Sequence, residues 1–345
     1  MRVRITMLAI VLGAGLLRAS SPAVVALPAD VDKYLRAAGK FTAADLAALE
    51  AGTVIAHAEQ GGTDTEMIVV AAVKIRSARE RTAKYYGDFV SYVDGQVTLA
   101  FGRFSRPPTV ADVSGLTLES DDVAALRSCR PGDCDLRIGG AGIEKLRSAI
   151  DWNAPDASAR ANAAARQAIV DYVAAYLSRG DDALVTFNDQ AQPVSLKDQW
   201  RGLLANSPLF YQYQPALRDY LAAFPRAPLA GARDVIYWIK ENYGRKPVIS
   251  IVHGVAYQAA AQPDRTTIVQ KLIYASHYYD ASLAVATVIG AIDAGQPVSY
   301  VVYANRSRGD LLKGGLGGLR RSIARDEAKK SAEGTLGSMK GALEK

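Results

Sequence analysis

The feature that most constrains this chain is a run of extended, β-branched sequence near its C-terminus. From Val248 to Asn305, Val, Ile, Thr and Tyr recur with a period of two, the pattern of β-strands. The segments VISIVHGVAYQ, TTIVQKLIYASHYYDASLAVATVIGAI and PVSYVVYAN are separated by AQPDR and DAGQP, which are rich in turn-forming residues. Three consecutive strands with short connections predict an antiparallel meander. A glycine-rich loop and a last helix from about Leu319 to Leu343 follow it.

The N-terminal part of the chain mixes helical and extended patterns. DVDKYLRAAG and FTAADLAALEAG predict two short helices, the second capped by Thr42 with Asp45 three residues later and ended by Gly52. TVIAHAEQ and EMIVVAAVKI predict strands joined by the hairpin residues GGTDT. SARERTAKYYGDFVSYV then reads as a helix, and QVTLAFGRFS as a further strand.

Helices and loops fill the middle of the chain from about Thr109 to Pro228, with ARANAAARQAIVDYVAAYLSRG as the clearest helix. Helices, a hairpin, a helical section, a meander and a last helix make an α+β order, because a parallel sheet would require strands and helices to alternate. The sequence therefore predicts one α+β domain over residues 27–345, with a helical insertion at about 109–228.

The first 26 residues predict a signal peptide. Arg2 and Arg4 precede an apolar run from Ile5 to Leu17, and small residues follow, the order of a secretory signal. The run is too short to span a bilayer comfortably. The formal charge of +6 includes three arginines of this segment, which has no acidic residue, so the remaining chain carries +3. We therefore expect a periplasmic or secreted protein that does not bind nucleic acid.

Two cysteines, Cys129 and Cys134, lie in SCRPGDCDL. Pro131 and Gly132 suit the central positions of a type II turn, which brings the flanking residues together. In an exported chain this favours a disulfide, which for so short a loop contributes about 2 kcal/mol. The alternatives are a redox pair, which normally has two residues between its cysteines, and a zinc site, which would need two further ligands.

The three histidines, His57, His253 and His277, each fall in or beside a predicted strand. A histidine in a strand is more often a hydrogen-bonded structural residue than a ligand, and none has the spacing of a metal motif. No metal site and no cofactor are therefore predicted. The motifs G-x-S-x-G, H-E-x-x-H and the phosphate loop are also absent from the sequence.

The stretch YASHYYDASL, residues 274–283, nevertheless contains the best catalytic candidates: His277 with Asp280 or Tyr278. In an unbroken strand, residues three apart point to opposite faces, so a dyad of His277 and Asp280 requires a bend or bulge between them. The alternative is that one face of this strand simply packs in the core.

A basic, glycine-rich run follows the meander in NRSRGDLLKGGLGGLRRSIAR, residues 305–325. Arginines near a helix N-terminus favour an anion or a lipid headgroup, although charge runs are usually solvated faces. The tyrosines of the C-terminal sheet offer apolar area with a polar tip, which suits either a core or a ligand cavity. The candidates for ligand contacts are Tyr257, Tyr274, His277, Tyr279, Tyr303, Arg306 and Arg308.

The segments GRFSRPP, CRPGDCDLRI, VIYWIKENYGRKPVISIVHGVAY, YASHYYDASL and YANRSRGDLLKGGLGGLRR resemble those of a family of uncharacterised exported bacterial proteins. The order of elements is also similar to the START-like helix-grip fold, whose sheet wraps around its last helix. That resemblance implies a small apolar ligand or lipid between the C-terminal meander and the last helix. The helical section at about 109–228 has no counterpart in a compact helix-grip domain.

Three hypotheses follow. The first is an exported protein that binds a hydrophobic ligand such as a lipid. The second is a periplasmic hydrolase that uses His277 with Asp280 or Tyr278. The third is an envelope interaction module whose basic loop, through Arg306 and Arg308, makes a transient contact with a membrane surface.

Overall fold

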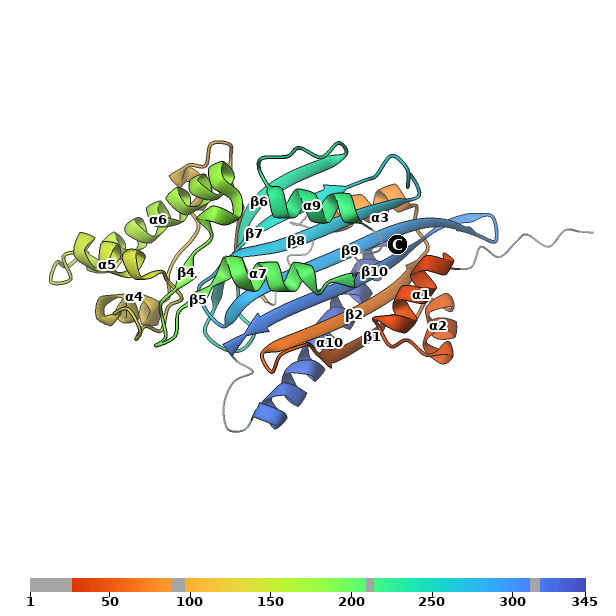
Figure 1. Ribbon diagram of the computed structural model, residues 1–345, viewed down its shortest axis with the longest axis horizontal. Helices are drawn as coiled ribbons and strands as arrows, with labels where there is room; N and C mark the ends of the chain where they lie inside the picture. Colours follow the sequence, from red (N-terminus) through yellow and green to blue (C-terminus); the bar gives the residue numbers. More distant parts are fainter. Residues whose placement is uncertain (1–26, 88–96, 209–213, 311–316) are drawn as a thin grey trace, which may run out of the picture.

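The computed structural model describes residues 27–87, 97–208, 214–310 and 317–345. The predicted signal peptide lies outside the described residues. At the centre of the molecule is an eight-stranded antiparallel sheet with the order β1-β2-β10-β9-β8-β7-β6-β3 (Figure 1). Its strands are β1 (Ile55–Gln60), β2 (Glu66–Ile75), β3 (Thr98–Arg103), β6 (Ala232–Glu241), β7 (Val248–Tyr257), β8 (Arg265–Ala275), β9 (Tyr279–Asp293) and β10 (Gln296–Gly309).

The sheet contains strands from both the N-terminal and the C-terminal parts of the chain. The hairpin β1–β2, predicted from GGTDT, is present, and β2 pairs with β10 along its whole length. On the other side, β3 pairs with β6, so the helical section begins and ends at adjacent strands. The α+β class, the antiparallel sheet and the long last helix are confirmed.

Helices cover both faces of the sheet (Figure 1). One face, here called the insertion face, packs against helices of the helical section: α6 (Ala157–Arg179), α7 (Leu196–Ala205) and α9 (Pro215–Ala223). Near β2 and β10, the same face packs against α1 (Ala29–Ala37) and α2 (Ala43–Glu50). The opposite face, here the α10 face, packs against α3 (Arg79–Gly87) and α10 (Gly317–Leu343). The remaining elements are α4 (Ser120–Ser128), α5 (Gly140–Ala149), the 3-10 helices Val110–Val113 and Gly180–Ala183, and the hairpin β4 (Thr186–Phe187) and β5 (Val194–Ser195).

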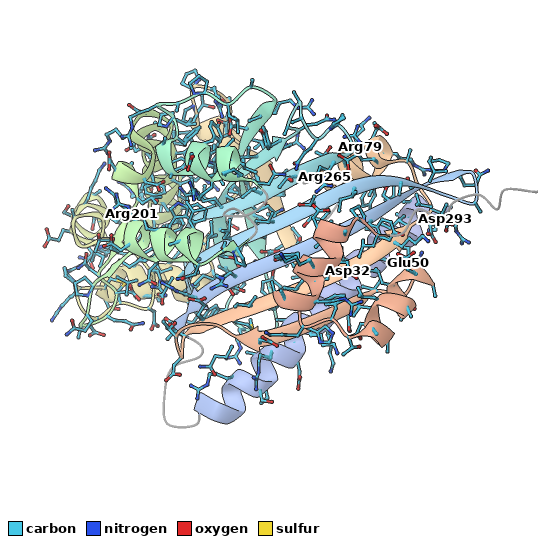
Figure 2. All side chains as sticks on the ribbon, turned by 45° about the vertical axis from the view of Figure 1, so that its right-hand side comes forward. Asp32, Glu50, Arg79, Arg201, Arg265 and Asp293 are labelled. Carbon is cyan, nitrogen blue, oxygen red and sulfur yellow. A yellow bond between two sulfur atoms is a disulfide. The ribbon has the colours of Figure 1, made fainter. Side chains whose placement is uncertain are left out.

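The predicted start of α2 is confirmed in detail. The Asp45 backbone N–H donates to Thr42 Oγ1 at 3.1 Å, and the Thr42 backbone N–H donates to Asp45 Oδ2 at 2.8 Å. Ion pairs then attach α2 to the sheet, because Lys74 on β2 contacts Glu50 at 3.0 Å and Asp293 at 2.7 Å. Figure 2 labels these two partners, Glu50 and Asp293, near each other in the view.

The meander has more strands than the sequence pattern predicted. Residues 232–241 form β6, a strand that was not predicted from the sequence, so β6 to β10 are five consecutive strands. The long strand expected through YASHYYDASL is two strands, β8 and β9, joined by a turn at Ser276 to Tyr278. Tyr278 has φ +63°, the left-handed conformation that reverses a chain. The sequence indicated a break near HYYD only as one of two alternatives, because no Gly, Pro or Asn marks a turn there.

The last helix lies across one end of the α10 face. It packs on β1, β2 and α3 through the buried residues Ala332, Leu336, Met339 and Leu343. These four positions fall in the C-terminal half of α10. In Figure 1 the N-terminal half extends past the edge of the sheet at β1. Within the described residues, no helix is both long and apolar enough to span a membrane.

Candidate functional site

The side chains of His277 and Asp280, at the β8–β9 turn, each contact a residue of the helical section. His277 Nε2 lies 3.1 Å from Asp122 Oδ1 on α4, and both residues are buried. Asp280 forms a buried ion pair with Arg137, whose backbone N–H also donates to the Ser276 carbonyl at 2.9 Å. The bend required for a His277–Asp280 dyad is thus present, but each side chain has a partner from the insertion. The hydrolase hypothesis stays a prediction.

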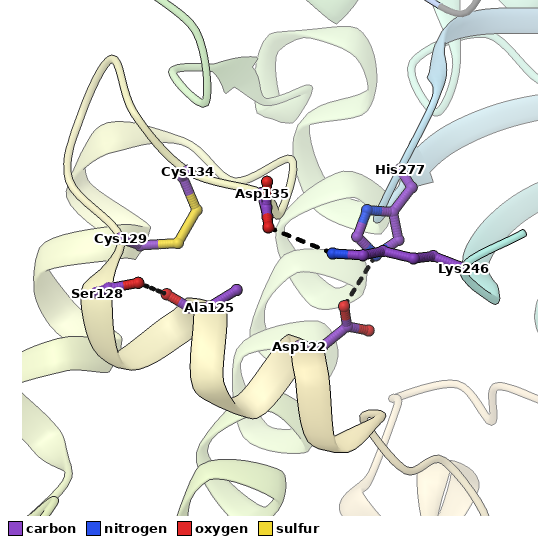
Figure 3. Close-up of a disulfide and its surroundings, with 8 residues drawn as sticks. All are labelled: Asp122, Ala125, Ser128, Cys129, Cys134, Asp135, Lys246 and His277. Atoms are coloured by element: carbon purple, nitrogen blue, oxygen red, sulfur yellow. Dashed lines mark hydrogen bonds and ion pairs between the residues drawn. A yellow bond between two sulfur atoms is a disulfide. The ribbon is translucent and has the colours of Figure 1, made fainter.

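The Cys129–Cys134 disulfide is present beside this contact (Figure 3). It closes the loop after α4, with Gly132 at φ +89° as the predicted type II turn requires. The same figure shows Lys246 Nζ 3.3 Å from Asp135 Oδ2, next to the His277–Asp122 pair. The disulfide therefore stabilises the segment that anchors the helical section to the sheet.

Two of the predicted ligand tyrosines lie on the insertion face. Tyr257 is a buried member of the core formed with the helical section. Tyr274 packs against Tyr172 and Phe187, with ring centroids 6.1 and 6.2 Å away, and burial raises its pKa. Both side chains are core residues of this interface.

The structure places Arg306 and Arg308 in a strand and not in the basic loop that the sequence predicted. Both belong to β10, and both contact Glu66, a carboxylate that is only 1% exposed. Arg306 Nη1 lies 2.6 Å and Arg308 Nε 2.8 Å from the Glu66 oxygens. A buried carboxylate requires such partners. These two arginines therefore neutralise an internal charge, which the sequence could not show because Glu66 is 240 residues away.

His253 lies in a buried polar chain under the helical section. Its Nδ1 is 2.8 Å from the Tyr176 hydroxyl and its Nε2 is 2.7 Å from Asp234. Burial lowers the pKa of His253, against the effect of the Asp234 carboxylate. The third histidine, His57, lies 3.3 Å from Asp45. The three histidines therefore have separate partners, and no metal-binding group of His, Cys, Asp or Glu is found in the part of the chain that the structure describes.

Tyr279 and Tyr303 lie instead on the α10 face, where further tyrosines join them. Side chains from α3, β6, the β6–β7 connection, β9 and β10 interact there electrostatically. We call this group the tyrosine cluster. Its members are Tyr86, Tyr237, Tyr243, Tyr279, Tyr303 and the carboxylate Glu241.

The tyrosines of this cluster come from elements that are far apart along the chain. Tyr237 on β6 and Tyr303 on β10 have three strands between them in the sheet. Helix α3, which carries the buried Tyr86, packs on β8, β9 and β10, and Tyr86 belongs to the same hydrophobic cluster as Tyr237, Tyr279 and Tyr303. The cluster therefore joins α3 to several strands on the α10 face.

Burial shifts the pKa of several groups in the cluster, yet some of these side chains remain accessible to solvent. Burial raises the pKa of Glu241, while a hydrogen bond from Tyr243 opposes the shift. Burial also raises the pKa of Tyr279 to about 12. Nevertheless Tyr243 is 52% exposed, and Glu241, Tyr279 and Tyr303 are each partly exposed. Aromatic and carboxylate side chains of the cluster therefore stay accessible to solvent.

Two hollows lie on the α1 side of the molecule. One lies between α1 and the sheet and is lined by residues that include Tyr34, Gln214 and Thr287. The other is open, lies between α1 and α2, and is lined by Leu27, Ala29, Asp32, Arg36, Leu46, Ala47 and Glu50. Both are on the side of α1, away from the α10 face, and neither contains a residue predicted for ligand contact.

The sequence contained part of the signal for this cluster. Alternation along VIYWIKE places Tyr237 and Glu241 on one face of a strand, and this would have linked them had β6 been assigned. Nothing local relates them to Tyr86 or Tyr303, because those residues belong to α3 and β10, which are distant from β6 along the chain.

Comparisons with known proteins do not show which family this chain belongs to. No family model matches the chain, and no curated protein matches it. One solved structure with weak similarity is norcoclaurine synthase from Thalictrum flavum in complex with dopamine and hydroxybenzaldehyde, with 9% identity, a TM-score of 0.20, and coverage of 44% of this chain and 79% of that one. Another is the di-domain ARO/CYC BexL from the BE-7585A biosynthetic pathway, with 10% identity, a TM-score of 0.23, and coverage of 81% and 99%. Scores this low carry no argument about fold or function.

Proposed function

We propose that this protein is an exported binding protein for a hydrophobic small molecule such as a lipid, held on the α10 face over the tyrosine cluster. The observation that carries the proposal is the partial exposure of Tyr279 and Tyr303 beside apolar side chains of the α10 face. Tyrosine binds apolar groups with its ring and polar groups with its hydroxyl.

The surroundings of the cluster support an apolar ligand. Phe101, Val235, Ile239 and Ala256 lie on the same face and are only partly buried. Contiguous apolar side chains that stay accessible mark binding surfaces. In a helix-grip arrangement, such a surface and the C-terminal helix together hold the ligand, and here α10 occupies the neighbouring part of the same face.

The disulfide is consistent with export, because such bonds persist in oxidising compartments. Cys129 and Cys134 are the two cysteines of the chain, and both are oxidised. A periplasmic or extracellular carrier would meet hydrophobic molecules that water alone does not transport, which fits the proposed ligand class.

Ligand extraction tests this proposal directly. The full chain would be purified without detergent, its bound small molecules extracted and analysed by mass spectrometry, and its affinity for a neutral hydrophobic dye measured by fluorescence. We expect a reproducible apolar ligand, and dye binding about tenfold weaker in Tyr303→Ala, because a ring of the contact surface is removed. Ile292→Ala is the matched control, since Ile292 is 51% exposed at the far end of β9. An empty protein whose two variants bind dye equally would refute the proposal.

A further inference from the structure

The hollow between α1 and the sheet lies where three parts of the chain meet. Helix α1 contributes Asp30, Val31 and Tyr34, and Gln214 is the residue before α9. Strands β8, β9 and β10 contribute Arg265, Thr287, Ile289 and Val302. The volume of the hollow is about 20 Å³, which is enough for a water molecule and far less than a site for an organic ligand requires.

The lining of this hollow combines apolar side chains with buried polar ones. Gln214 is 6% exposed and Thr287 is 7% exposed. Gln214 Nε2 donates to Gln262 Oε1 at 3.1 Å, and the hydroxyl oxygens of Thr287 and Thr267 lie 3.3 Å apart. An amide and a hydroxyl can each form more than one hydrogen bond, so both lining residues keep the capacity to bind a further group.

Arg265, which is labelled in Figure 2, is the lining residue whose hydrogen bonds are incomplete. Its Nη1 donates to Asp30 Oδ2 at 2.7 Å, and its Nη2 donates to Asp264 Oδ2 at 3.3 Å. Its Nε is buried and has no acceptor among the residues that the structure describes. Leaving a buried N–H without an acceptor is destabilising, and most buried donors in proteins have one. Since two carboxylates already pair with the guanidinium, a neutral acceptor is sufficient.

We propose that the hollow under α1 binds an ordered water molecule that accepts a hydrogen bond from Arg265 Nε and is held by the polar groups of Gln214 and Thr287. Buried waters usually have a few polar protein groups as partners, and these three residues supply them. Water is neutral, both accepts and donates hydrogen bonds, and matches the volume of the hollow. This water links β8 and β9 to the start of α9 beneath α1, so it is part of the fold. The inference is independent of the ligand proposed for the α10 face.

NMR spectroscopy of the full chain detects such a water directly. We expect a cross-peak between water and the Arg265 Nε–H in nitrogen-edited NOESY and ROESY spectra, with opposite signs in the two experiments, because a long-lived bound water transfers magnetisation through space. Equal signs identify hydrogen exchange with the solvent instead and, like a missing cross-peak, overturn the proposal. Arg201 on α7 is the internal control, since its side chain is 63% exposed and its Nε–H should show exchange only.

Filling the hollow gives a second test through the sign of a stability change. Val302→Ile adds one methylene group to the lining, which displaces the water and leaves Arg265 Nε without an acceptor. We expect a lower midpoint of urea unfolding and a folding equilibrium constant about tenfold smaller. A dry hollow would gain packing contacts instead, so a higher midpoint would overturn the proposal.

The variant Arg265→Met separates the loss of the water from steric strain. Methionine has no N–H, so Val302→Ile in this background leaves no donor unpaired and should lower the midpoint much less than it does in the wild type. Strain from the larger side chain would lower the midpoint equally in both backgrounds, and that result would also overturn the proposal. Urea unfolding of the wild type, the two single variants and the double variant gives the comparison.

Discussion

His277, at the turn between β8 and β9, lies 3.1 Å from Asp122 on α4, a residue 155 positions earlier in the chain. Both side chains are buried, at 4% and 2% exposure. The most chemically suggestive stretch of the sequence is therefore the place where the helical section attaches to the sheet.

Removal of Asp122 should destabilise this attachment. Asp122→Ala leaves a buried imidazole without its partner, and we expect the free energy of unfolding to fall by about 1–3 kcal/mol, measured by urea denaturation at pH 7. The double variant Asp122→Ala/His277→Ala should lose less than the sum of the two single losses, because the two residues interact directly. Asp121→Ala, the exposed neighbour on the same helix, is the control and should change stability by about 0.5 kcal/mol or less. Equal stability of the two single aspartate variants would contradict the assigned role.

Lys271 and Asp181 form a buried ion pair. Removing Asp181 alone should destabilise the protein more than replacing both residues by apolar ones. Lys271 is fully buried on the insertion face, with its ammonium 4.2 Å from the Trp200 ring centroid. Burial lowers its pKa to about 8, against the charge of Asp181. Asp181→Ala would leave the ammonium unpaired, so we expect a loss of about 3–5 kcal/mol.

Replacing both partners by apolar residues, as in Asp181→Leu/Lys271→Met, should cost much less, since no buried charge then remains. Thermal and denaturant unfolding of the variants measure this difference. Asp182→Ala is the control, because Asp182 is about half exposed and its pairs with Lys197 and Arg226 lie at the surface. A single variant at Asp181 that is no less stable than the double variant would show that the pair is not isolated from water.

His253 should make stability decrease on acidification. Burial holds the pKa of His253 below its ordinary value of 6.5, so below pH 6.5 the unfolded chain binds a proton that the folded chain does not. The free energy of unfolding should then fall by up to about 1.4 kcal/mol per pH unit as pH decreases below 6.5, until the pKa of the folded state is reached. Urea denaturation between pH 7.5 and 5 measures the slope.

His253→Asn should flatten this part of the profile, because asparagine does not titrate. It also perturbs the hydrogen bonds to Tyr176 and Asp234, so the quantity to compare is the slope and not the absolute stability. An identical slope in variant and wild type would mean that another group is responsible.

The sequence by itself determined the features whose partners are close along the chain. The capping box of Thr42 and Asp45 spans three residues, the β1–β2 hairpin closes over GGTDT, and the disulfide joins residues five apart. Local hydrogen bonds and turn geometry suffice for each. The α+β order and the long last helix followed from periodicity in the same way.

Only the tertiary structure decided where the meander turns and which side chains meet. The turn at Ser276 to Tyr278 has strand-like sequence on both sides, and its anchors Asp122 and Arg137 are about 140 or more residues away. Tyr237 and Tyr303 belong to one hydrophobic cluster although three strands lie between β6 and β10. A strand pattern specifies which face a residue occupies, but curvature and strand order depend on packing over the whole chain, and these brought the tyrosine cluster together.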